Sequence, residues 1–324
     1  MSLTQDIKQK ITEMGFDLAG ITDASPIDSQ QVELFTAWLD CGFAGQMDYM
    51  RRNLHKRTNP AELLENAQSV IIAGLNFNPP IQKKSPDTTL PMGMIVDYAQ
   101  YQDYHPFIEK RLCELTDFIS SKSGGNLQFK ICVDSAPIAE RALAVRAGLG
   151  FIGKNHMLIN PEFGCRIFLG EVITNLKLEK DVPIASDCSI CHKCIDACPT
   201  GALRADGQLD ASRCINYLTI EQKGPIPIEM AGKIGDRLFG CNECIRVCPY
   251  QENAPACKNT QFKFYSDRTA ISLQEVLDLN QESFEAKFSN SVILRSGLDR
   301  LKRNAENCLM NITQNRNEKA ACSE

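Results

Sequence analysis

The chain has 324 residues, of which 43% are hydrophobic and 23% are charged, and its formal net charge is −5 at pH 7. A chain of this length is typical of about two domains, and the balanced composition excludes general disorder. It has neither an apolar run long enough to span a membrane nor an apolar leader, so we expect a cytoplasmic protein. The acidic balance excludes a surface that is basic throughout, but it permits a local basic patch.

The N-terminal part predicts helices and strands in alternation. Ile7, Ile11 and Met14 recur at helical spacing, and the apolar run from Ser69 to Phe77 is typical of a buried strand. A polar loop rich in proline is expected over 78–92. The elements expected before that loop are a helix over 4–14, a strand over 16–21, a helix over 29–40 and a strand over 69–77.

The next part of the sequence places a carboxylate at the end of a strand. Asp103 is a suitable N-cap for a helix over 103–122, and a strand over 129–134 ends at Asp134. Pro137 suits the first turn of a helix that continues to Gly148. Segments 157–160 and 167–173 predict a hairpin. We therefore expect a mixed α/β or α+β fold over residues 1–180.

Apolar periodicity weakens near 187, where a new domain is expected to begin. Helical patterns return over 268–310, and 311–324 predicts a frayed polar tail. The sequence is thus divided into 1–180, a cysteine-rich part over 181–260 and a helical C-terminal part over 261–324.

The cysteines are the most specific feature of the sequence. There are fifteen, an odd number that excludes a complete disulfide framework. Four of them follow the bacterial ferredoxin pattern C-x2-C-x2-C-x3-C-P: Cys188, Cys191, Cys194 and Cys198. Three more repeat its second half: Cys241, Cys244 and Cys248. Leu238 occupies the position of the missing ligand, and Cys214 can replace it.

Eight thiolates are enough for two four-iron clusters. In the ferredoxin pattern the fourth cysteine binds the other cluster, which divides the ligands into two sets. The first set is Cys188, Cys191, Cys194 and Cys248, and the second is Cys198, Cys214, Cys241 and Cys244. Two zinc sites are the alternative, but the uninterrupted run favours iron–sulfur. The remaining seven cysteines, at 41, 113, 132, 165, 257, 308 and 322, are interpreted as small buried or surface residues.

Three further features of the sequence suggest binding or catalysis. Asp134 is either an N-cap or, if desolvated against a cofactor, an acid with a raised pKa. The G-x-G-x-x-G at 148–153 follows a helix, so a glycine loop that lets a flat ligand approach the backbone is favoured over a dinucleotide site. The histidines at 55, 105, 156 and 192 lack metal-ligand spacing. Basic runs at 51–57 and 295–303 are solvated faces or a strip that binds phosphates.

Several motifs together resemble the epoxyqueuosine reductase family, whose members are cobalamin and iron–sulfur enzymes of tRNA modification. The matching segments, besides the eight cysteines, are VDSAPIAERALAVRAGLGFIGKNHMLINPEFG from Val133, RIFLGEVITNL from Arg166, INYLTIEQKGPIP from Ile215, DYAQYQDYHP from Asp97 and FEAKFSNSVILRSGLDRLKRN from Phe284. The resemblance implies a cobalamin-binding domain over 1–180 and a ferredoxin-like module with two [4Fe-4S] clusters over 181–260. It also implies a short helical C-terminus.

The resemblance further implies a reaction and its partners. Electrons from an external donor of the flavodoxin or ferredoxin type would pass through the clusters to base-off cobalamin. The epoxide of epoxyqueuosine at the wobble position of a tRNA with a GUN anticodon would be reduced to queuosine, with Asp134 as the proton donor. We expect a monomer with no membrane partner.

The remaining site residues come from the same resemblance. The expected cobalamin contacts, besides Asp134, are Arg57, Asp97, Asn155, His156, Leu158 and Leu169. The candidate tRNA contacts are Lys223, Arg295, Arg300, Lys302 and Arg303. Two departures stand out: many members continue beyond this length with a helical repeat that grips tRNA, and Cys165 replaces a small polar residue.

Two other functions compete with this one. A cobalamin-dependent reductive dehalogenase would share the architecture, but the sequence has no twin-arginine export signal, and its basic runs suit a polyanionic substrate. A ferredoxin-type electron carrier with an enlarged docking domain is the second alternative. Failure of the chain to bind cobalamin would exclude both enzyme functions.

Overall fold

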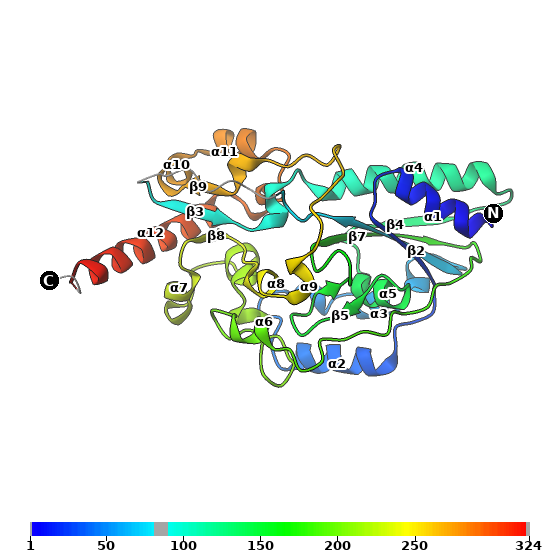
Figure 1. Cartoon of the computed structure of the whole chain (residues 1–324), viewed down its shortest axis with the longest axis horizontal. Coiled ribbons are helices and arrows are strands. Elements are labelled where there is room, and N and C mark those ends of the chain that lie inside the picture. The colour runs from blue at the N-terminus through cyan, green and yellow to red at the C-terminus, as the bar shows by residue number, and fades with distance from the viewer. Residues whose placement is uncertain (1, 81–89, 322–324) are drawn as a thin grey trace.

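The computed structural model describes residues 2–80 and 90–321, and a four-stranded sheet lies in the right-hand half of the molecule in Figure 1. The strand order is β1 (Leu18–Asp23), β2 (Ser69–Asn76), β7 (Ile167–Thr174) and β4 (Phe129–Cys132). Every neighbouring pair is antiparallel. The structure is therefore a mixed α+β fold. In parallel sheets ligands bind at the carboxyl ends of the strands, but this sheet is antiparallel, so that rule gives no reason to place a ligand at Asp134.

Helices cover both faces of this sheet, as Figure 1 shows. On one face, α1 (Leu3–Glu13) and α4 (Tyr104–Lys122) pack through side chains such as Ile11 and Leu112. On the other, α5 (Glu140–Arg146) packs through Leu143, and α2 (Ser29–Asp40) and α3 (Leu54–Thr58) lie below it in Figure 1. Every residue of β2 and β7 is buried because both strands are covered on both faces.

The predictions for these elements are largely confirmed, including Asp103 as the N-cap of α4. Two details were wrong. The segment at 157–160 does not pair with 167–173; its strand β6 (Leu158–Ile159) pairs with β5 (Phe151–Ile152). The helix after β4 begins at Glu140, so Pro137 lies in the preceding loop rather than in its first turn. The predicted loop over 78–92 falls partly outside the described residues, and β3 begins at Met92.

A second sheet joins distant parts of the chain. Its order is β8 (Arg237–Phe239), β3 (Met92–Ile95) and β9 (Ala270–Ser272), one strand from each of the three expected parts. Three helices complete its core: α10 (Leu273–Asp278), α11 (Gln281–Phe288) and α12 (Leu298–Ala321).

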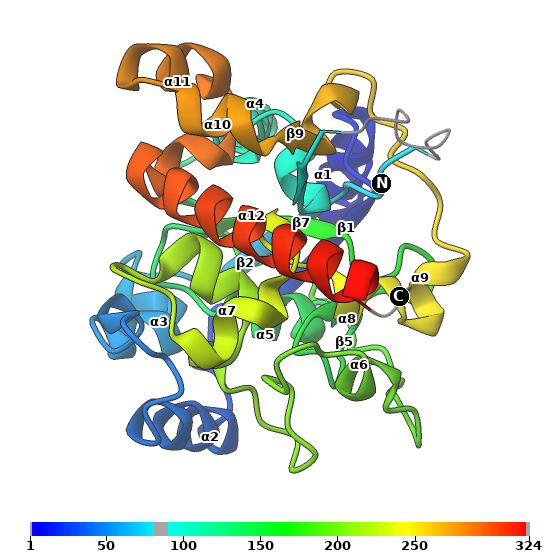
Figure 2. The ribbon, with the colours of Figure 1, turned by 90° about the vertical axis from the view of Figure 1, so that its left-hand side faces the viewer.

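The expected polar tail over 311–324 was wrong as far as residue 321, because α12 continues to Ala321. Two asparagines anchor this helix where the tail was expected to begin. The side chains of Asn307 and Asn311 are buried and donate to the carbonyl of Ala231, and Asn311 also donates to Gly235. These bonds occupy carbonyls at the end of α7 (Ile228–Ile234), which lies beside α12 in Figure 2. The last three residues lie outside the described part.

Besides α7 and β8, the cysteine-rich part contains loops and three helices of four residues each. These are α6 (Lys193–Asp196), α8 (Glu243–Arg246) and α9 (Pro249–Glu252), and α6 packs against α8. None of the helices described is both long enough and apolar enough to cross a membrane.

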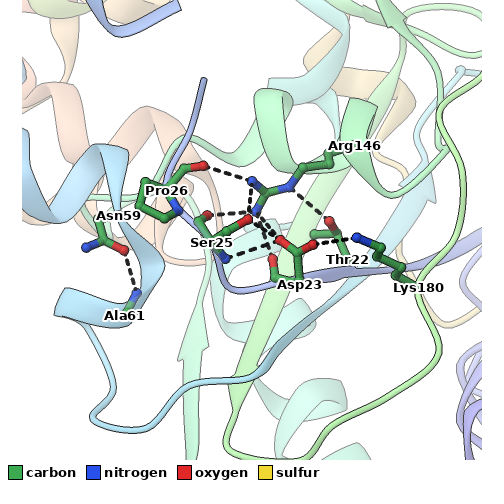
Figure 3. A network of polar contacts seen from close by, with 8 residues as sticks. All are labelled: Thr22, Asp23, Ser25, Pro26, Asn59, Ala61, Arg146 and Lys180. Atoms are coloured by element: carbon green, nitrogen blue, oxygen red, sulfur yellow. Dashed lines mark hydrogen bonds and ion pairs between the residues drawn. The ribbon is translucent and has the colours of Figure 1, made fainter. Parts of the chain in front are cut away.

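Arg146 ties α5 to the loop after β1, as Figure 3 shows. Its guanidinium donates to the carbonyls of Asp23, Ser25 and Pro26 and to the hydroxyl of Thr22. Since α5 directly follows the Asp134 loop, this network fixes the far end of the element that supports Asp134.

Candidate functional site

Asp134 occupies a strained turn between β4 and α5. Its φ of 52° is in the left-handed region, which non-glycine residues seldom adopt. Its backbone N–H donates to Oε1 of Glu140 at 2.6 Å, and Glu140 is the first residue of α5. The side chain is 54% exposed, so its carboxylate is accessible. An uncommon backbone conformation held by a hydrogen bond to a neighbouring side chain is typical of functional sites.

His105 connects this loop to the start of α4. Its Nδ1 lies 2.6 Å from Oδ1 of Asp103, and its Nε2 lies 3.1 Å from Oδ2 of Asp134. Nη1 of Arg295 lies 2.9 Å from the same Nε2 and 3.5 Å from the hydroxyl of Ser135. The imidazole also stacks on Tyr104, with 4.0 Å between ring centroids. Elements far apart in the sequence therefore meet at one carboxylate.

The electrostatics of this cluster favour ion pairing. Burial favours the neutral form of Asp134, but the hydrogen bond from His105 and the charges of His105 and Arg295 outweigh it, so the pKa of Asp134 is lowered. Burial opposes the charged form of His105, but its bonds to Asp103 and Asp134 outweigh this and raise its pKa. The neighbours of Asp134 in the structure are cationic and lower its pKa, whereas the raised pKa was predicted for a carboxyl desolvated against a cofactor and stays a prediction.

Two tyrosines and an arginine complete the surroundings of Asp134. Burial, followed by the charges of Glu221 and Asp134, raises the pKa of Tyr49 to about 12. Burial also raises the pKa of Tyr98, which interacts with both Asp134 and the thiol of Cys214. Arg57 interacts with Tyr49 and Asp134. The site is therefore close to one member of the cysteine pattern.

The first predicted cysteine set lines a single pocket. Lys154 Nζ donates to the carbonyls of Ser189 and Cys191, and the Lys154 N–H donates to Sγ of Cys188 at 3.4 Å. The glycine loop at 148–153 therefore leads into the wall of this pocket rather than into a dinucleotide site. The pocket is lined by Cys188, Cys191, Cys194, Cys248, Lys154, Asn155, Ile159, Lys193, Pro249 and Tyr250.

The second predicted set gathers around Cys244. Burial and the neighbouring thiols raise the pKa of Cys244, and Cys214, Cys241 and Cys198 are among those neighbours. Cys194 also interacts with Cys244, so the two sets adjoin. Across residues 2–80 and 90–321, no three His, Cys, Asp or Glu side chains are grouped to hold one metal ion. In a four-iron cubane each thiolate binds a different iron.

Some of the other expected cofactor contacts already have partners within the protein or lie in its core, whereas two have buried nitrogens without a partner among the described residues. Asp97 forms an ion pair with Arg166 at 2.5 Å, and Asn155 donates to Sγ of Cys165 at 3.6 Å. Leu158 and Leu169 are buried in the core below α5. In contrast, Nε of Arg57 and Nε2 of His156 are buried and have no hydrogen-bond partner among the described residues.

The candidate tRNA contacts also separate into groups. Lys223 is exposed, and Lys302 is partly exposed. Arg300 donates to the carbonyl of Ile220, and Arg303 donates to the carbonyls of Leu218, Gln222 and Gly224. Arg300 and Arg303 therefore hold the loop that carries Lys223, and Arg295 belongs to the cluster around Asp134.

Sequence reasoning missed several residues of the site. His105 lacks metal-ligand spacing, and the one signal of a role is its place in the DYAQYQDYHP segment that carries the resemblance. Glu140 lies in the Asp134 motif, but it was not assigned a role. Glu171 is a charged residue inside a buried apolar strand, and that contrast could have marked it.

Two family models match the sequence. The 4Fe-4S double cluster binding domain matches residues 187–251, and the model for epoxyqueuosine reductase QueG (DUF1730) matches residues 57–135. A curated relative, the epoxyqueuosine reductase of Vibrio cholerae serotype O1, is 37% identical over 303 residues, covering 93% of this chain and 81% of the relative.

Solved structures agree with these matches. An epoxyqueuosine reductase crystallised with an epoxyqueuosine-modified tRNA-Tyr stem loop has a TM-score of 0.89 and 32% identity, covering 95% of this chain and 81% of that chain. The Bacillus subtilis enzyme, solved with its Asp134 catalytic loop swung out of the active site, has a TM-score of 0.88 and 32% identity at the same coverage. The chain therefore belongs to the epoxyqueuosine reductase family.

Proposed function

We propose that this chain reduces the epoxide of epoxyqueuosine in tRNA to give queuosine. The observation that carries the proposal is the likeness, at a TM-score of 0.89, to a relative crystallised with epoxyqueuosine-modified tRNA. The accessible Asp134 carboxylate, with His105 and Arg295 beside it, supports an acid–base reaction at this point.

The two cysteine sets are proposed to bind two [4Fe-4S] clusters. The match to a double cluster domain over 187–251 supports this assignment. Cys188, Cys191, Cys194 and Cys248 would bind the first cluster, and their common pocket supports that grouping. Cys198, Cys214, Cys241 and Cys244 would bind the second, which would lie nearer to Asp134 through Tyr98.

The residues around Asp134 fit a cobalamin cofactor. Buried nitrogens of Arg57 and His156 lack partners among the described residues, and a cofactor rich in amide and phosphate oxygens would supply acceptors. Arg57, Asp97, Asn155, His156, Leu158 and Leu169 would hold it. When bound base-off, cobalamin would supply a reduced cobalt that passes electrons to the epoxide.

Asp134 would supply a proton to the substrate oxygen. Reduction of the epoxide to an alkene takes up two electrons and two protons, and the oxygen leaves as water. His105 would orient the carboxylate, because its ring is fixed on the other side by Asp103. Arg295 would balance the charge of the free carboxylate.

The partners follow from the same reaction. We propose tRNA with a GUN anticodon as the substrate carrier, contacted by Lys223 and Lys302, with Arg300 and Arg303 supporting the loop. An external donor of the flavodoxin or ferredoxin type would deliver electrons to a cytoplasmic monomer. The division into a cofactor part over 1–180, a cluster part over 181–260 and a helical part over 261–324 completes the proposal.

A direct assay tests this function. The anaerobically reconstituted chain, supplied with cobalamin and a chemical reductant, should convert epoxyqueuosine to queuosine in tRNA from a strain that lacks the gene. Mass spectrometry of the digested tRNA measures both nucleosides. Unchanged epoxyqueuosine, with clusters and cobalamin both present in the protein, would exclude the function.

A further inference from the structure

A buried carboxyl group lies beneath the Asp134 loop without a donor for either of its oxygens. Glu171 is in the middle of β7 and is 0% exposed. Its neighbours in the sheet are Ile72 on β2 and Cys132 on β4. Neither carboxylate oxygen has a hydrogen-bond partner among the described residues. An isolated buried carboxylate would be very costly, so this group needs a proton or a partner.

The group that contacts Glu171 is a second carboxyl. The side chain of Glu140 comes from the start of α5, which packs on β7, and it is placed to share a hydrogen bond with Glu171 if one of the two carboxyl groups carries a proton. Two carboxylates have only acceptors, so one of them must carry a proton for a hydrogen bond to form. Like charges held together in a buried site share a proton in this way.

We propose that Glu140 and Glu171 form a carboxyl pair that holds one shared proton, and that Glu140 positions the Asp134 loop. The positioning part rests on the proposed function of Asp134. With the proton on Glu171, Glu140 receives two hydrogen bonds, one from Glu171 and one from the Asp134 N–H at 2.6 Å. Together these bonds hold Asp134 in its left-handed conformation.

The electrostatic surroundings agree with a shared proton. Burial raises the pKa of Glu171 well above its ordinary value, and the charges of Glu140 and Asp134 add to this effect. Burial and the charge of Asp134 raise the pKa of Glu140 to about 7, although the Asp134 N–H and two cations oppose them. The titratable and charged groups that face the pair are Asp134, Cys132, His105, Arg141, Arg57 and Tyr104.

The shared proton has two readouts that do not depend on turnover. Infrared spectroscopy of the reconstituted protein at neutral pH should show the band of a protonated carboxylic acid. Glu171→Gln, which mimics the neutral acid and still donates to Glu140, should remove that band. Glu109→Gln, on an exposed position of α4, is the matched control and should keep it.

Stability provides the second readout. A raised folded pKa makes the native state bind more protons than the unfolded state, so stability falls as pH rises toward the folded pKa. The difference between the unfolding midpoints, Glu171→Gln minus the natural protein, should therefore increase as pH rises from 5 to 8. Absence of the carboxylic acid band from the natural protein would show that no proton is shared. The same conclusion would follow if Glu171→Gln kept the band and its stability changed with pH in parallel with that of the natural protein.

A comparison of two substitutions tests positioning. Glu140→Gln keeps an acceptor for the Asp134 N–H, whereas Glu140→Ala removes it. We expect Glu140→Ala to lower kcat about 10- to 100-fold with little change in KM, and Glu140→Gln to recover most of that loss. If both variants were as active as the natural protein, Glu140 would not position the Asp134 loop. If no form reduces the epoxide but Glu171→Gln removes the band, the proposed function fails while the shared proton stands.

Discussion

Nε2 of His105 lies 3.1 Å from Oδ2 of Asp134, and this contact joins the start of α4 to the loop after β4. The other ring nitrogen is held by Asp103, which is also the N-cap of α4. The imidazole therefore has a fixed orientation, and its positive form stabilises the ionised form of Asp134. The proton affinity of Asp134 is thus controlled by a residue from another element.

Removal of His105 should shift the pH dependence of the reaction. A proton donor is active while protonated, so the rate falls as pH rises through its pKa. His105 lowers the pKa of Asp134, and His105→Ala should raise it. The alkaline limb of kcat/KM should move to higher pH, as measured by single-turnover assays across pH. A limb that moves to lower pH would contradict the assigned interaction.

Asp134→Ala should separate chemistry from cofactor binding. Asp134 is not one of the cluster cysteines, and the other proposed cobalamin contacts stay in place, so the variant should keep iron and cobalamin. Loss of a general acid should lower kcat by about 10²- to 10⁴-fold. Iron and corrinoid analysis beside the tRNA assay measures both effects, and Glu109→Gln serves as the control. Near-normal epoxide reduction by Asp134→Ala would exclude its role as the proton donor.

Substitution of single cysteines should distinguish ligands from other thiols. The natural protein should contain about eight irons, and Cys244→Ala should retain about four if one cluster is lost. Cys113→Ala is the matched control, because Cys113 is exposed on α4 and outside both sets. Iron analysis after anaerobic reconstitution measures the difference. Full iron content in Cys244→Ala would contradict the assignment of the second set.

Lys223, which lies on a loop, and Arg303, which holds that loop from α12, should behave differently. Lys223→Ala should weaken tRNA binding and reduce the slope of log K against log salt by about 1. Arg303→Ala should instead lower the free energy of unfolding by about 1–3 kcal/mol, because it removes the donor from the part-buried carbonyls of Leu218 and Gln222. Binding titrations at several salt concentrations and denaturant unfolding measure the two effects. Equal salt slopes for Lys223→Ala and the natural protein would remove Lys223 from the interface.

Local patterns in the sequence were sufficient for much of the fold. Helix α4 was predicted because its N-cap and its apolar spacing lie within the helix itself. Strand β2 was predicted because a continuous apolar run is itself a local signal. The hairpin between 157–160 and 167–173 was wrong because neither segment specifies its partner, and β7 forms more contacts between β2 and β4.

The sequence by itself determined the cysteine spacing and the position of Asp134 at the end of a strand, because both depend on neighbours along the chain. Only the tertiary structure decided what surrounds Asp134. His105 contacts it from α4, Arg295 lies beside His105 from the turn before α12, and Glu140, which bonds the Asp134 N–H, lies over Glu171 on β7; no local pattern encodes such a meeting. Packing of distant elements sets the burial and charge around a carboxyl group, and burial and charge set its pKa.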